Sequence, residues 1–394
     1  MNKQCPVSDW DPFSDEALAD PFSAYEELRN LAPIVHLQKY DCLAVLDFTA
    51  MSEVLSDWET YSSAAGVGLA NFNTDPPWRP KSIILEVDPP EHDITRRVLN
   101  RVLSRPAMEK MRQTFSVEAK RLVAFLVATK EFDGVKDLAE VYPLMVFPDA
   151  VGLVREGREN LLLYGSMVFN ATYTGNCHFE DAAEKSGQTV EWILKQCARD
   201  ALTEDGLGAQ TYAAADKGEI SEEEAGMLVR SLLSAGVDTT VNAIGSALYC
   251  FGRNPEQWQI LRENPELARG VIDEVLRLEG GVINFFRTTT RESELCGYHV
   301  PENIKVLVLF SAANRDPKRW HEPEKFDIQR DLRDHVGFGG GIHKCVGQMV
   351  ARLEMELILT ELINTVSKLD IIGEPVRRLN NGLRGLDSLL LRVS

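Results

Sequence analysis

Apolar residues recur at intervals of three and four positions along most of the chain, which is the pattern of helices that bury one face. This periodicity predicts helices over 105–128, 154–170, 222–252, 255–280 and 346–368. Strand-like stretches are short and fall at 33–47, 295–309 and 383–393. No segment has the composition of an interdomain linker, and no internal repeat is present. The pattern predicts a mainly α protein with small β-sheets, folded as a single domain over 1–394, with a β-richer part over about 30–75 and 283–310 and a helical core over about 80–280 and 345–368.

The longest helical pattern covers residues 221–252 and begins with Ser221, followed three residues later by Glu224, which is the spacing of a capping box. About 30 residues rising 1.5 Å each make a helix of roughly 45 Å, long enough to cross a domain of this size. Its middle reads SLLSAGVDTT over 231–240, with glycine, an acid and two hydroxyls where helix propensity favours leucine and alanine. A requirement other than helix stability explains this choice of residues.

Composition narrows the possible partners. Sixty Asp and Glu against 42 Lys and Arg give a formal net charge of −18, which argues against nucleic acid, because binding a phosphate backbone requires a basic face. The first 22 residues hold no apolar run long enough for a signal peptide or an anchor, so we expect a cytoplasmic protein without a membrane partner. The seven cysteines form no C-x-x-C pair, so most of them should be reduced thiols.

The most informative segment is FGGGIHKCVG over 338–347. Its glycines let the backbone approach a flat ligand, and Cys345 lies at the start of a helical pattern, where the helix dipole and nearby cations should lower the pKa of the thiol. A glycine loop beside a free cysteine, such as a phosphate cradle, is the alternative. The segment resembles the F-G-x-G-x-H-x-C-x-G haem loop of the cytochrome P450 family. The resemblance implies haem b with Cys345 as the axial ligand of the iron, and with Phe338 and Gly339 beside the cofactor.

The resemblance runs from about residue 10 to residue 394 and implies the fold of that family, a triangular prism with the haem between a long distal helix and a proximal helix. Glu274 and Arg277 match its E-x-x-R motif, and PEKFDIQR, which ends at Arg330, matches the segment that supplies a second arginine. By resemblance these three side chains form a buried structural network behind the haem loop. The cations that resemble ligands of the haem propionates are His92, Arg96, Arg287 and His343. For His335, a haem contact and a surface position both stay open.

The sequence AGVDT over 235–239 resembles the oxygen-binding A-G-x-[DE]-T of the family on its distal helix. The resemblance implies that Thr239 hydrogen-bonds the bound oxygen and that Asp238 feeds protons through water. Ala235 would lie over the macrocycle, and Gly236 would leave a gap for dioxygen. The alternative is that Asp238 and Thr239 only satisfy backbone carbonyls in a kinked helix.

Electrons must come from another protein, because the chain has no nucleotide-binding fingerprint and no iron–sulfur cysteine cluster. By resemblance to bacterial relatives, they come from NAD(P)H through a reductase and an acidic iron–sulfur ferredoxin, and the protein is a monomer. The cations in segments expected at the docking face behind Cys345 are Arg97, Arg101, Lys110, Arg112, Lys344 and Arg352. They form either a local basic patch or solvated surface.

The resemblance narrows to family members that oxidise para-substituted benzoic acids such as 4-methoxybenzoate. It rests on 76–92, 228–245, 285–291, 311–320, 335–354 and 380–389. A buried carboxylate must be paired, and this subfamily anchors it at the positions of Arg79, Ser82, Arg230 and Ser231. The residues at its pocket-lining positions are Leu85, Phe169, Ser234, Ala235, Val282 and Phe285. Thr172, followed by Tyr173, departs from the relatives, which place a second phenylalanine there, so we expect a wider or more polar pocket.

Together these features predict a haem-thiolate monooxygenase that activates O₂ to oxidise a small para-substituted aromatic carboxylic acid. Oxidative O-demethylation of 4-methoxybenzoate to 4-hydroxybenzoate and formaldehyde is the leading hypothesis. Hydroxylation of another small aromatic or cinnamate-type acid is the alternative within the same class. A haem gas sensor or an electron carrier is a different class, and Asp238 and Thr239 argue against it, because neither role needs a proton relay.

Overall fold

Helices account for most of the regular structure, which confirms the prediction of a mainly α protein. The computed structural model describes residues 3–75, 77 and 79–394, so Pro76 and Trp78 of the stretch 76–92 lie outside the described residues. The α-helices are α1 (Asp15–Ala19), α2 (Phe22–Leu31), α3 (Phe48–Ser56), α4 (Glu91–Val102), α5 (Arg105–Thr129), α6 (Val141–Val151), α7 (Asn160–Asn170), α8 (Cys177–Lys185), α9 (Thr189–Gln196), α10 (Leu207–Asp216), α11 (Glu222–Gly236), α12 (Asp238–Arg253), α13 (Pro255–Glu263), α14 (Val271–Leu278), α15 (Phe310–Ala313) and α16 (Gln348–Thr365). Short 3₁₀ turns are η1 (Gln38–Tyr40), η3 (Arg199–Ala201), η4 (Pro265–Arg269) and η5 (Gly341–His343), and η2 (Gly134–Ala139) is a π-helical turn. Within the described ranges, no helix is long and apolar enough to cross a bilayer.

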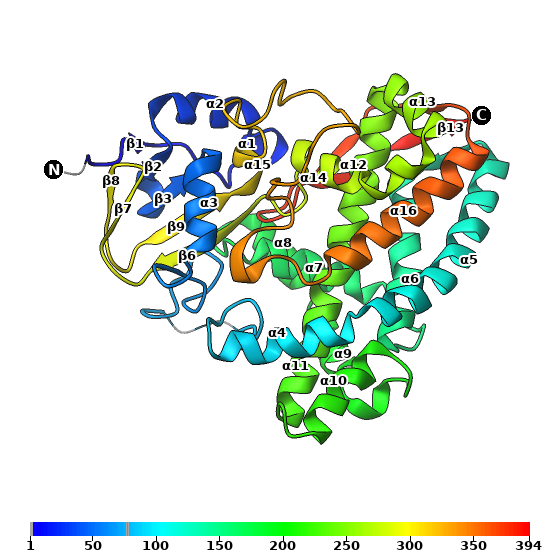
Figure 1. Ribbon diagram of the computed structural model, residues 1–394, viewed down its shortest axis with the longest axis horizontal. Coiled ribbons are helices and arrows are strands. Elements are labelled where there is room, and N and C mark those ends of the chain that lie inside the picture. The colour runs from blue at the N-terminus through cyan, green and yellow to red at the C-terminus, as the bar shows by residue number, and fades with distance from the viewer. Residues whose placement is uncertain (1–2, 76, 78) are drawn as a thin grey trace.

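The strands are short and gather mainly in one sheet on the side of the molecule away from the long helices (Figure 1). They are β1 (Val7–Ser8), β2 (Ile34–Leu37), β3 (Cys42–Val45), β4 (Tyr61–Ser62), β5 (Glu131–Asp133), β6 (Asn284–Thr289), β7 (Ser293–Leu295), β8 (Tyr298–Val300), β9 (Lys305–Leu309), β10 (Leu369–Ile371), β11 (Val376–Arg378), β12 (Gly385–Ser388) and β13 (Leu390–Val393). The large sheet has the order β1-β2-β3-β9-β6-β4, with β3 parallel and β6 antiparallel to β9. A second sheet has the order β10-β13-β5, and β7 with β8 and β11 with β12 form hairpins.

Several elements differ from the predicted ranges, in each case because the chain turns inside a continuous apolar pattern. The stretch 33–47 folds back at Asp41, whose φ is +45°, and 295–309 turns at Asn303, whose φ is +58°. The helix predicted over 255–280 is divided into α13, η4 and α14, because Pro265 cannot continue the preceding helix. The helix predicted over 154–170 starts only at residue 160, after Gly157 adopts a φ of +78°.

The long helix predicted over 221–252 begins as expected, because Ser221 and Glu224 form both hydrogen bonds of a capping box. It is not continuous, however, since α11 ends at Gly236 and α12 begins at Asp238. At Gly236, an added Cβ would lie 2.2 Å from the ring of Phe147, so only glycine lets α6 pack this closely. The prediction of one uninterrupted helix was therefore wrong at its centre.

Side chains replace backbone hydrogen bonds at this break. The Thr239 hydroxyl donates to the carbonyl of Ala235 at 2.7 Å, and the Thr240 hydroxyl donates to the carbonyl of Gly236 at 3.4 Å. Just beyond, the Asn242 amide donates to the carbonyl of Asp238 at 2.7 Å. Hydroxyl and amide groups that compete with the backbone are poor helix formers elsewhere, but here they satisfy the carbonyls that the break would leave unpaired.

A fully buried ion pair fixes the segment behind the cysteine loop. Arg277 of α14 donates to Glu274 at 2.7 and 2.9 Å, and both side chains are 0% exposed. Arg277 also donates to the carbonyls of Asn314, Pro323 and Lys325. Arg330 approaches the same carboxylate at 3.4 Å, so one buried acid joins α14 to the strand-free stretch before the cysteine loop. The spacing E-x-x-R thus places both partners on one helix face.

We expect Arg277→Ala to lower the free energy of unfolding by about 3–5 kcal/mol, because it leaves the Glu274 carboxylate buried without its cation. Urea denaturation followed by circular dichroism measures this loss. Arg333→Ala is the matched control, since its pair with Asp331 is exposed at 86% and 61% and its removal should leave the stability unchanged. Equal small effects of the two substitutions would contradict a structural role for the buried pair.

Candidate active site

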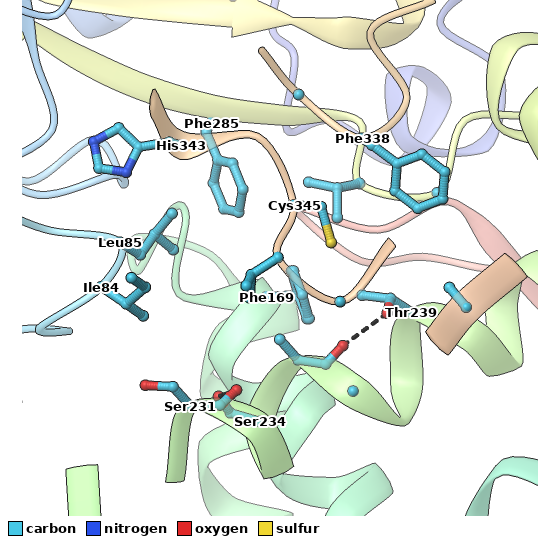
Figure 2. Close-up of a pocket in the computed structure, with 18 of the residues that line it drawn as sticks. Ile84, Leu85, Phe169, Ser231, Ser234, Thr239, Phe285, Phe338, His343 and Cys345 are labelled. Carbon is cyan, nitrogen blue, oxygen red and sulfur yellow. Dashed lines mark hydrogen bonds between the residues drawn. The ribbon is translucent and has the colours of Figure 1, made fainter. Parts of the chain in front are cut away.

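A largely apolar cavity of about 300 Å³ lies between α11 and α12 on one side and the cysteine loop on the other. Figure 2 shows Cys345, Thr239 and the rings of Phe169, Phe285 and Phe338 around this space, with Ser231 and Ser234 at another end of it. The segments that meet here are far apart in sequence: the loop after β4, the end of α7, the α11–α12 break, β6 and the loop before α16. A small aromatic ligand fits a cavity of this kind.

Two left-handed glycines shape the loop that carries Cys345. Gly339 has a φ of +70° and Gly341 has a φ of +60°, a region that other residues rarely adopt. At Gly341, a Cβ would lie 1.9 Å from the carbonyl oxygen of Leu55 in α3, so the loop can pack here only as glycine. The backbone N–H of Cys345 donates to the carbonyl of Phe338 at 2.9 Å, which closes the loop and directs the thiol into the cavity.

The electrostatics of Cys345 differ from the expectation. Burial raises the pKa of the Cys345 thiol, and the opposing effects of the Gly347 N–H, Arg96 and Arg352 do not reverse this. The prediction of a lowered pKa counted the helix dipole and the cations but not the cost of desolvating a thiolate in an apolar cavity. A coordinated metal ion deprotonates a thiol outright, so the site favours thiolate only when a metal binds it.

Four predicted propionate ligands lie at one edge of the cavity, and protein carboxylates pair with them incompletely. Among the described residues, neither ring nitrogen of His92 or of His343 has a hydrogen-bond partner. A carboxylate oxygen lies 3.5 Å from each ring, of Asp93 and of Asp88 respectively, and the two rings lie 4.7 Å apart. Arg287 is 5% exposed and donates to its neighbouring carbonyl at 2.9 Å, and within the described ranges neither Arg287 nor Arg96 pairs with a carboxylate. Burial lowers the pKa of His92, Arg96 and His343, and lowers the pKa of Arg287 to about 10.

Such a group of buried cations is costly unless an anion completes it. The carboxylates of haem propionates have the required charge and hydrogen-bonding capacity, so these residues fit haem b with Cys345 as the ligand of its iron. The protein carboxylate nearest to His343 is Asp88, whose Oδ1 lies 3.5 Å from His343 Nε2 and whose Oδ2 accepts a hydrogen bond from Ser62.

His335 is not part of this group. It is 8% exposed, which rules out a surface position, and its Nε2 lies 2.9 Å from Asp273 Oδ1.

Asp238 is 1% exposed and turns away from Thr239 toward the C-terminal strands. Its Oδ1 accepts from Arg378 of β11 at 3.1 Å, while its Oδ2 has no partner among the described residues. Burial raises the pKa of the Asp238 carboxyl, although Arg378 opposes this. Arg378 also pairs with Asp387 at 2.8 Å and with Glu140 at 3.4 Å, so it joins Asp238 to a carboxylate that is half exposed. Sequence analysis missed Arg378, because no local pattern marks a pairing across 140 residues.

The residues predicted to anchor the acid come from two segments, α11 and the loop before α4. Ser231 and Ser234 line the cavity, and their hydroxyls donate to the carbonyls of Met227 and Ser231 at 2.9 and 3.3 Å. Ser231 lies eight residues before Thr239, roughly 12 Å along the helix axis. Arg230 is half-buried and is not among the residues that line the cavity.

Arg79 and Ser82 belong to the loop before α4 and also line the cavity. The Ser82 hydroxyl accepts from the N–H of Leu85 at 3.2 Å. Arg79 donates to both oxygens of Glu86, at 2.7 and 3.0 Å, a partner that sequence analysis did not anticipate. The only signal for this contact in the sequence was the four-residue spacing of Ser82 and Glu86. Such a spacing occurs too often in proteins to predict an interaction.

The apolar lining brings together the side chains expected from the sequence. Leu85, Phe169, Val282 and Phe285 all face the cavity, as do Ile84 and Phe147, which were not predicted. Thr172 is 4% exposed, and its hydroxyl donates to the carbonyl of Phe169 at 3.0 Å. Tyr173 points elsewhere and stacks on Phe13 with ring centroids 4.6 Å apart. The small side chain of Thr172 therefore widens one wall.

Most of the cations expected at the docking face are already paired with acids. Arg101 pairs with Glu219 at 2.9 Å, Lys110 with Asp205 at 2.8 Å, Arg112 with Glu356 at 2.9 Å and Arg352 with Asp273 at 2.7 Å. Arg97 and Lys344 are exposed and form no ion pair within the described residues. The predicted basic patch is consequently smaller than the sequence indicated.

A buried thiol and buried basic side chains at the edge of one cavity are the groups that a haem-thiolate protein needs. The chain belongs to the cytochrome P450 family, since it is 47% identical over 385 residues to cytochrome P450 CYP199A2 of Rhodopseudomonas palustris, across 98% of this chain and 93% of that relative. Residues 179–369 match the family described as Cytochrome P450. The chain is accordingly a P450 monooxygenase, and its family uses haem b, O₂ and electrons that originate from NAD(P)H and arrive through redox partner proteins.

More distant relatives share the whole fold. Beta-dihydromenaquinone-9 omega-hydroxylase of Mycobacterium tuberculosis is 26% identical over 401 residues, across 98% of this chain and 79% of its own length. The solved structure of cytochrome P450 CREJ in complex with (4-ethylphenyl) dihydrogen phosphate superposes with a TM-score of 0.86 at 26% identity, covering 98% of this chain and 99% of that one. The fold expected from the resemblance is confirmed.

We expect Arg287→Gln to release haem about tenfold faster than the wild type, because it removes a buried cation that would face a propionate. Transfer of haem to an excess of apomyoglobin measures the rate. Arg291→Gln, an exposed position just beyond β6, is the control and should retain haem normally. Identical rates for all three proteins would show that Arg287 does not hold the cofactor.

Proposed function

We propose that this monooxygenase oxidises a small para-substituted aromatic carboxylic acid, and that its reaction is the O-demethylation of 4-methoxybenzoate. The observation that carries the proposal is the make-up of the cavity wall, in which a few polar groups interrupt an apolar lining. Arg79, Ser82 and Ser231 supply a cation and hydroxyls, Phe169 and Phe285 supply apolar rings, and Cys345 and Thr239 line the same cavity. An acid held by the cation and the hydroxyls would direct its para substituent toward the iron.

The haem, when bound through Cys345, supplies oxygen activation, because thiolate donation favours cleavage of the O–O bond. The chain's own residues would position the substrate and move protons. Thr239, whose hydroxyl donates to Ala235 at the helix break, would reorient to serve the oxygen site, and Asp238 would pass protons to it through water. One oxygen atom enters a methoxy C–H bond, and the other leaves as water after taking up two electrons and two protons. The resulting hemiacetal gives formaldehyde and 4-hydroxybenzoate.

One comparison supports an aromatic anion. The solved cytochrome P450 CREJ binds (4-ethylphenyl) dihydrogen phosphate, a ring with an anionic group para to an alkyl group. A ligand of the same pattern, with carboxylate in place of phosphate, matches the cations and hydroxyls of this cavity.

The second candidate is hydroxylation of another small aromatic or cinnamate-type acid, and the wall at Thr172 favours it. A threonine whose hydroxyl is used by the Phe169 carbonyl leaves room for a longer or additionally substituted ring. A gas sensor or an electron carrier stays disfavoured, because Thr239 at the cavity and the buried Asp238, which Arg378 joins to the half-exposed Asp387, suit proton delivery, which neither role needs.

For the electron donor we propose a small acidic iron–sulfur ferredoxin that docks on the face behind Cys345. Arg97 and Lys344 are the exposed cations available there, with the acid-paired Arg101, Lys110, Arg112 and Arg352 around them. Complementary charge would steer the encounter and make its rate depend on ionic strength.

We expect 4-methoxybenzoate to displace the water on ferric iron and to shift the Soret band toward the high-spin form. Arg79→Ala should weaken binding of this acid by about tenfold and binding of 4-methoxybenzamide much less, because only the acid loses a charge partner. Spectral titration of both ligands measures the difference. A Soret band unmoved by a panel of para-substituted benzoates would remove the substrate proposal, and equal losses for acid and amide would exclude charge anchoring.

We expect Thr239→Ala to divert reducing equivalents to hydrogen peroxide, because it removes the hydroxyl that would protonate the bound oxygen. The ratio of formaldehyde to NAD(P)H consumed, measured together with peroxide, reports this coupling. Thr239→Ser keeps the hydroxyl and should restore most of it. Wild-type coupling in the alanine variant would refute the role assigned to Thr239.

A further inference from the structure

The Arg79 guanidinium, which lines the cavity, already forms an ion pair with a carboxylate of the protein. Arg79 Nη1 lies 2.7 Å from Glu86 Oε2, and Nη2 lies 3.0 Å from Oε1, which is a two-pronged pair. Arg79 is 22% exposed and lines the cavity, whereas Glu86 is 1% exposed and lies behind it. An acid that enters the cavity and uses Arg79 therefore meets a cation whose charge is already balanced.

Glu86 has support of its own that does not depend on Arg79. Its Oε2 accepts from the backbone N–H of Ser82 at 2.8 Å, and its Oε1 accepts from the backbone N–H of Val67 at 3.4 Å. These two donors come from both ends of the loop that forms this wall of the cavity. Glu86 therefore keeps two hydrogen-bond donors when its cation is shared.

A buried lysine adds to this support. Lys305 of β9 donates to the carbonyls of Ala65 and Gly66 at 3.0 and 2.9 Å, directly before Val67. Burial lowers the pKa of Lys305 to about 7, and the negative charge of Glu86 acts in the opposite direction. Lys305 therefore holds the backbone next to the Val67 N–H that donates to Glu86.

We propose that Glu86 is a specificity-determining residue, an internal carboxylate that competes with the carboxylate of the substrate for Arg79. The inference rests on the proposed function, since it concerns the anchor for an aromatic acid. An acid ligand must take a share of Arg79 away from Glu86, so its affinity is a difference between two similar ion pairs. A neutral ring leaves the pair intact and does not meet this cost. Glu86 thus lowers the affinity for acids selectively and keeps Arg79 compensated when no acid is bound.

The same contacts are compatible with a purely structural pair that only holds the loop, and the two roles predict opposite results. If Glu86 competes, removing its charge makes acids bind more tightly. If it only holds the loop, removing its charge loosens the wall, and acid and neutral ligands lose affinity together.

The experiment compares haem-loaded wild type with Glu86→Gln, by spectral titration and by calorimetry, using 4-methoxybenzoate and 4-methoxybenzamide. Gln keeps the size of the side chain and removes its charge. The acid should bind about tenfold more tightly to the variant, because the carboxylate of Glu86 no longer competes for Arg79, while the affinity for the amide should not change. Glu91→Gln, an exposed acid in the first turn of α4, is the matched control and should leave both affinities at the wild-type values.

A double-substitution cycle shows whether the effect passes through Arg79. In an Arg79→Gln background, Glu86→Gln should no longer tighten binding of the acid. Glu86→Asp covers the case in which the Gln variant does not fold, since it keeps the charge on the loop but draws it one methylene back from Arg79. The Asp variant should also bind the acid more tightly than the wild type, by a smaller factor.

Unchanged or weaker acid binding by the Glu86 variants would overturn the competition. So would an equal gain for acid and amide, because a neutral ligand does not need Arg79. If the wild type binds 4-methoxybenzoate and the variants do not tighten it, only this inference fails. If the wild type binds neither 4-methoxybenzoate nor any other para-substituted benzoate, the proposed function fails, and the inference fails with it.

Discussion

A charge enclosed in apolar surroundings must find a partner, and this constraint orders the whole molecule. Arg277 shows the constraint met entirely by the protein, with Glu274 and three backbone carbonyls around a guanidinium that is 0% exposed. Arg287 and His343 are almost as well buried, yet neither has a carboxylate within good hydrogen-bonding distance. The first kind of site holds the fold together. The second kind is complete only when an anionic cofactor lies in the cavity, which is why the haem propionates fit there.

The same constraint governs the two acidic groups at the oxygen end. Burial favours the neutral form of both Cys345 and Asp238. A coordinated iron resolves this for the cysteine by replacing its proton. For Asp238 the protein supplies Arg378, which also contacts Asp387 and Glu140 and so ties the carboxyl to the molecular surface. At the break between α11 and α12, hydroxyls bind the exposed carbonyls and offset the cost of interrupting the helix.

At the proposed substrate anchor, the protein itself supplies a partner for the buried charge before any substrate binds. Glu86 compensates Arg79 while the cavity holds no acid, and the backbone N–H groups of Ser82 and Val67 keep Glu86 stable when that cation is shared. The affinity for an acid then depends on how well Arg79 binds the substrate carboxylate compared with the carboxylate of Glu86, and not on Arg79 alone. Thr172 acts through its size, because a small, internally bonded side chain leaves space in the cavity. Charge at Arg79 and volume at Thr172 would together select the ligand.

The sequence by itself determined what depends on near neighbours along the chain. The helical periodicity, the capping box at Ser221 and the glycine loop before Cys345 depend on residues a few positions apart, so local spacing encodes them. The pair of Glu274 with Arg277 also spans one helical turn, but its burial was expected only from the family resemblance. Pairings across the fold had no such signal. Tertiary structure alone decided that Arg378 reaches Asp238 from 140 residues away, that Lys305 faces the loop of Glu86, and that the acids along the chain neutralise most of the cations near Cys345. It also decided the raised pKa of Cys345, because desolvation depends on everything packed around a group, which no local pattern records.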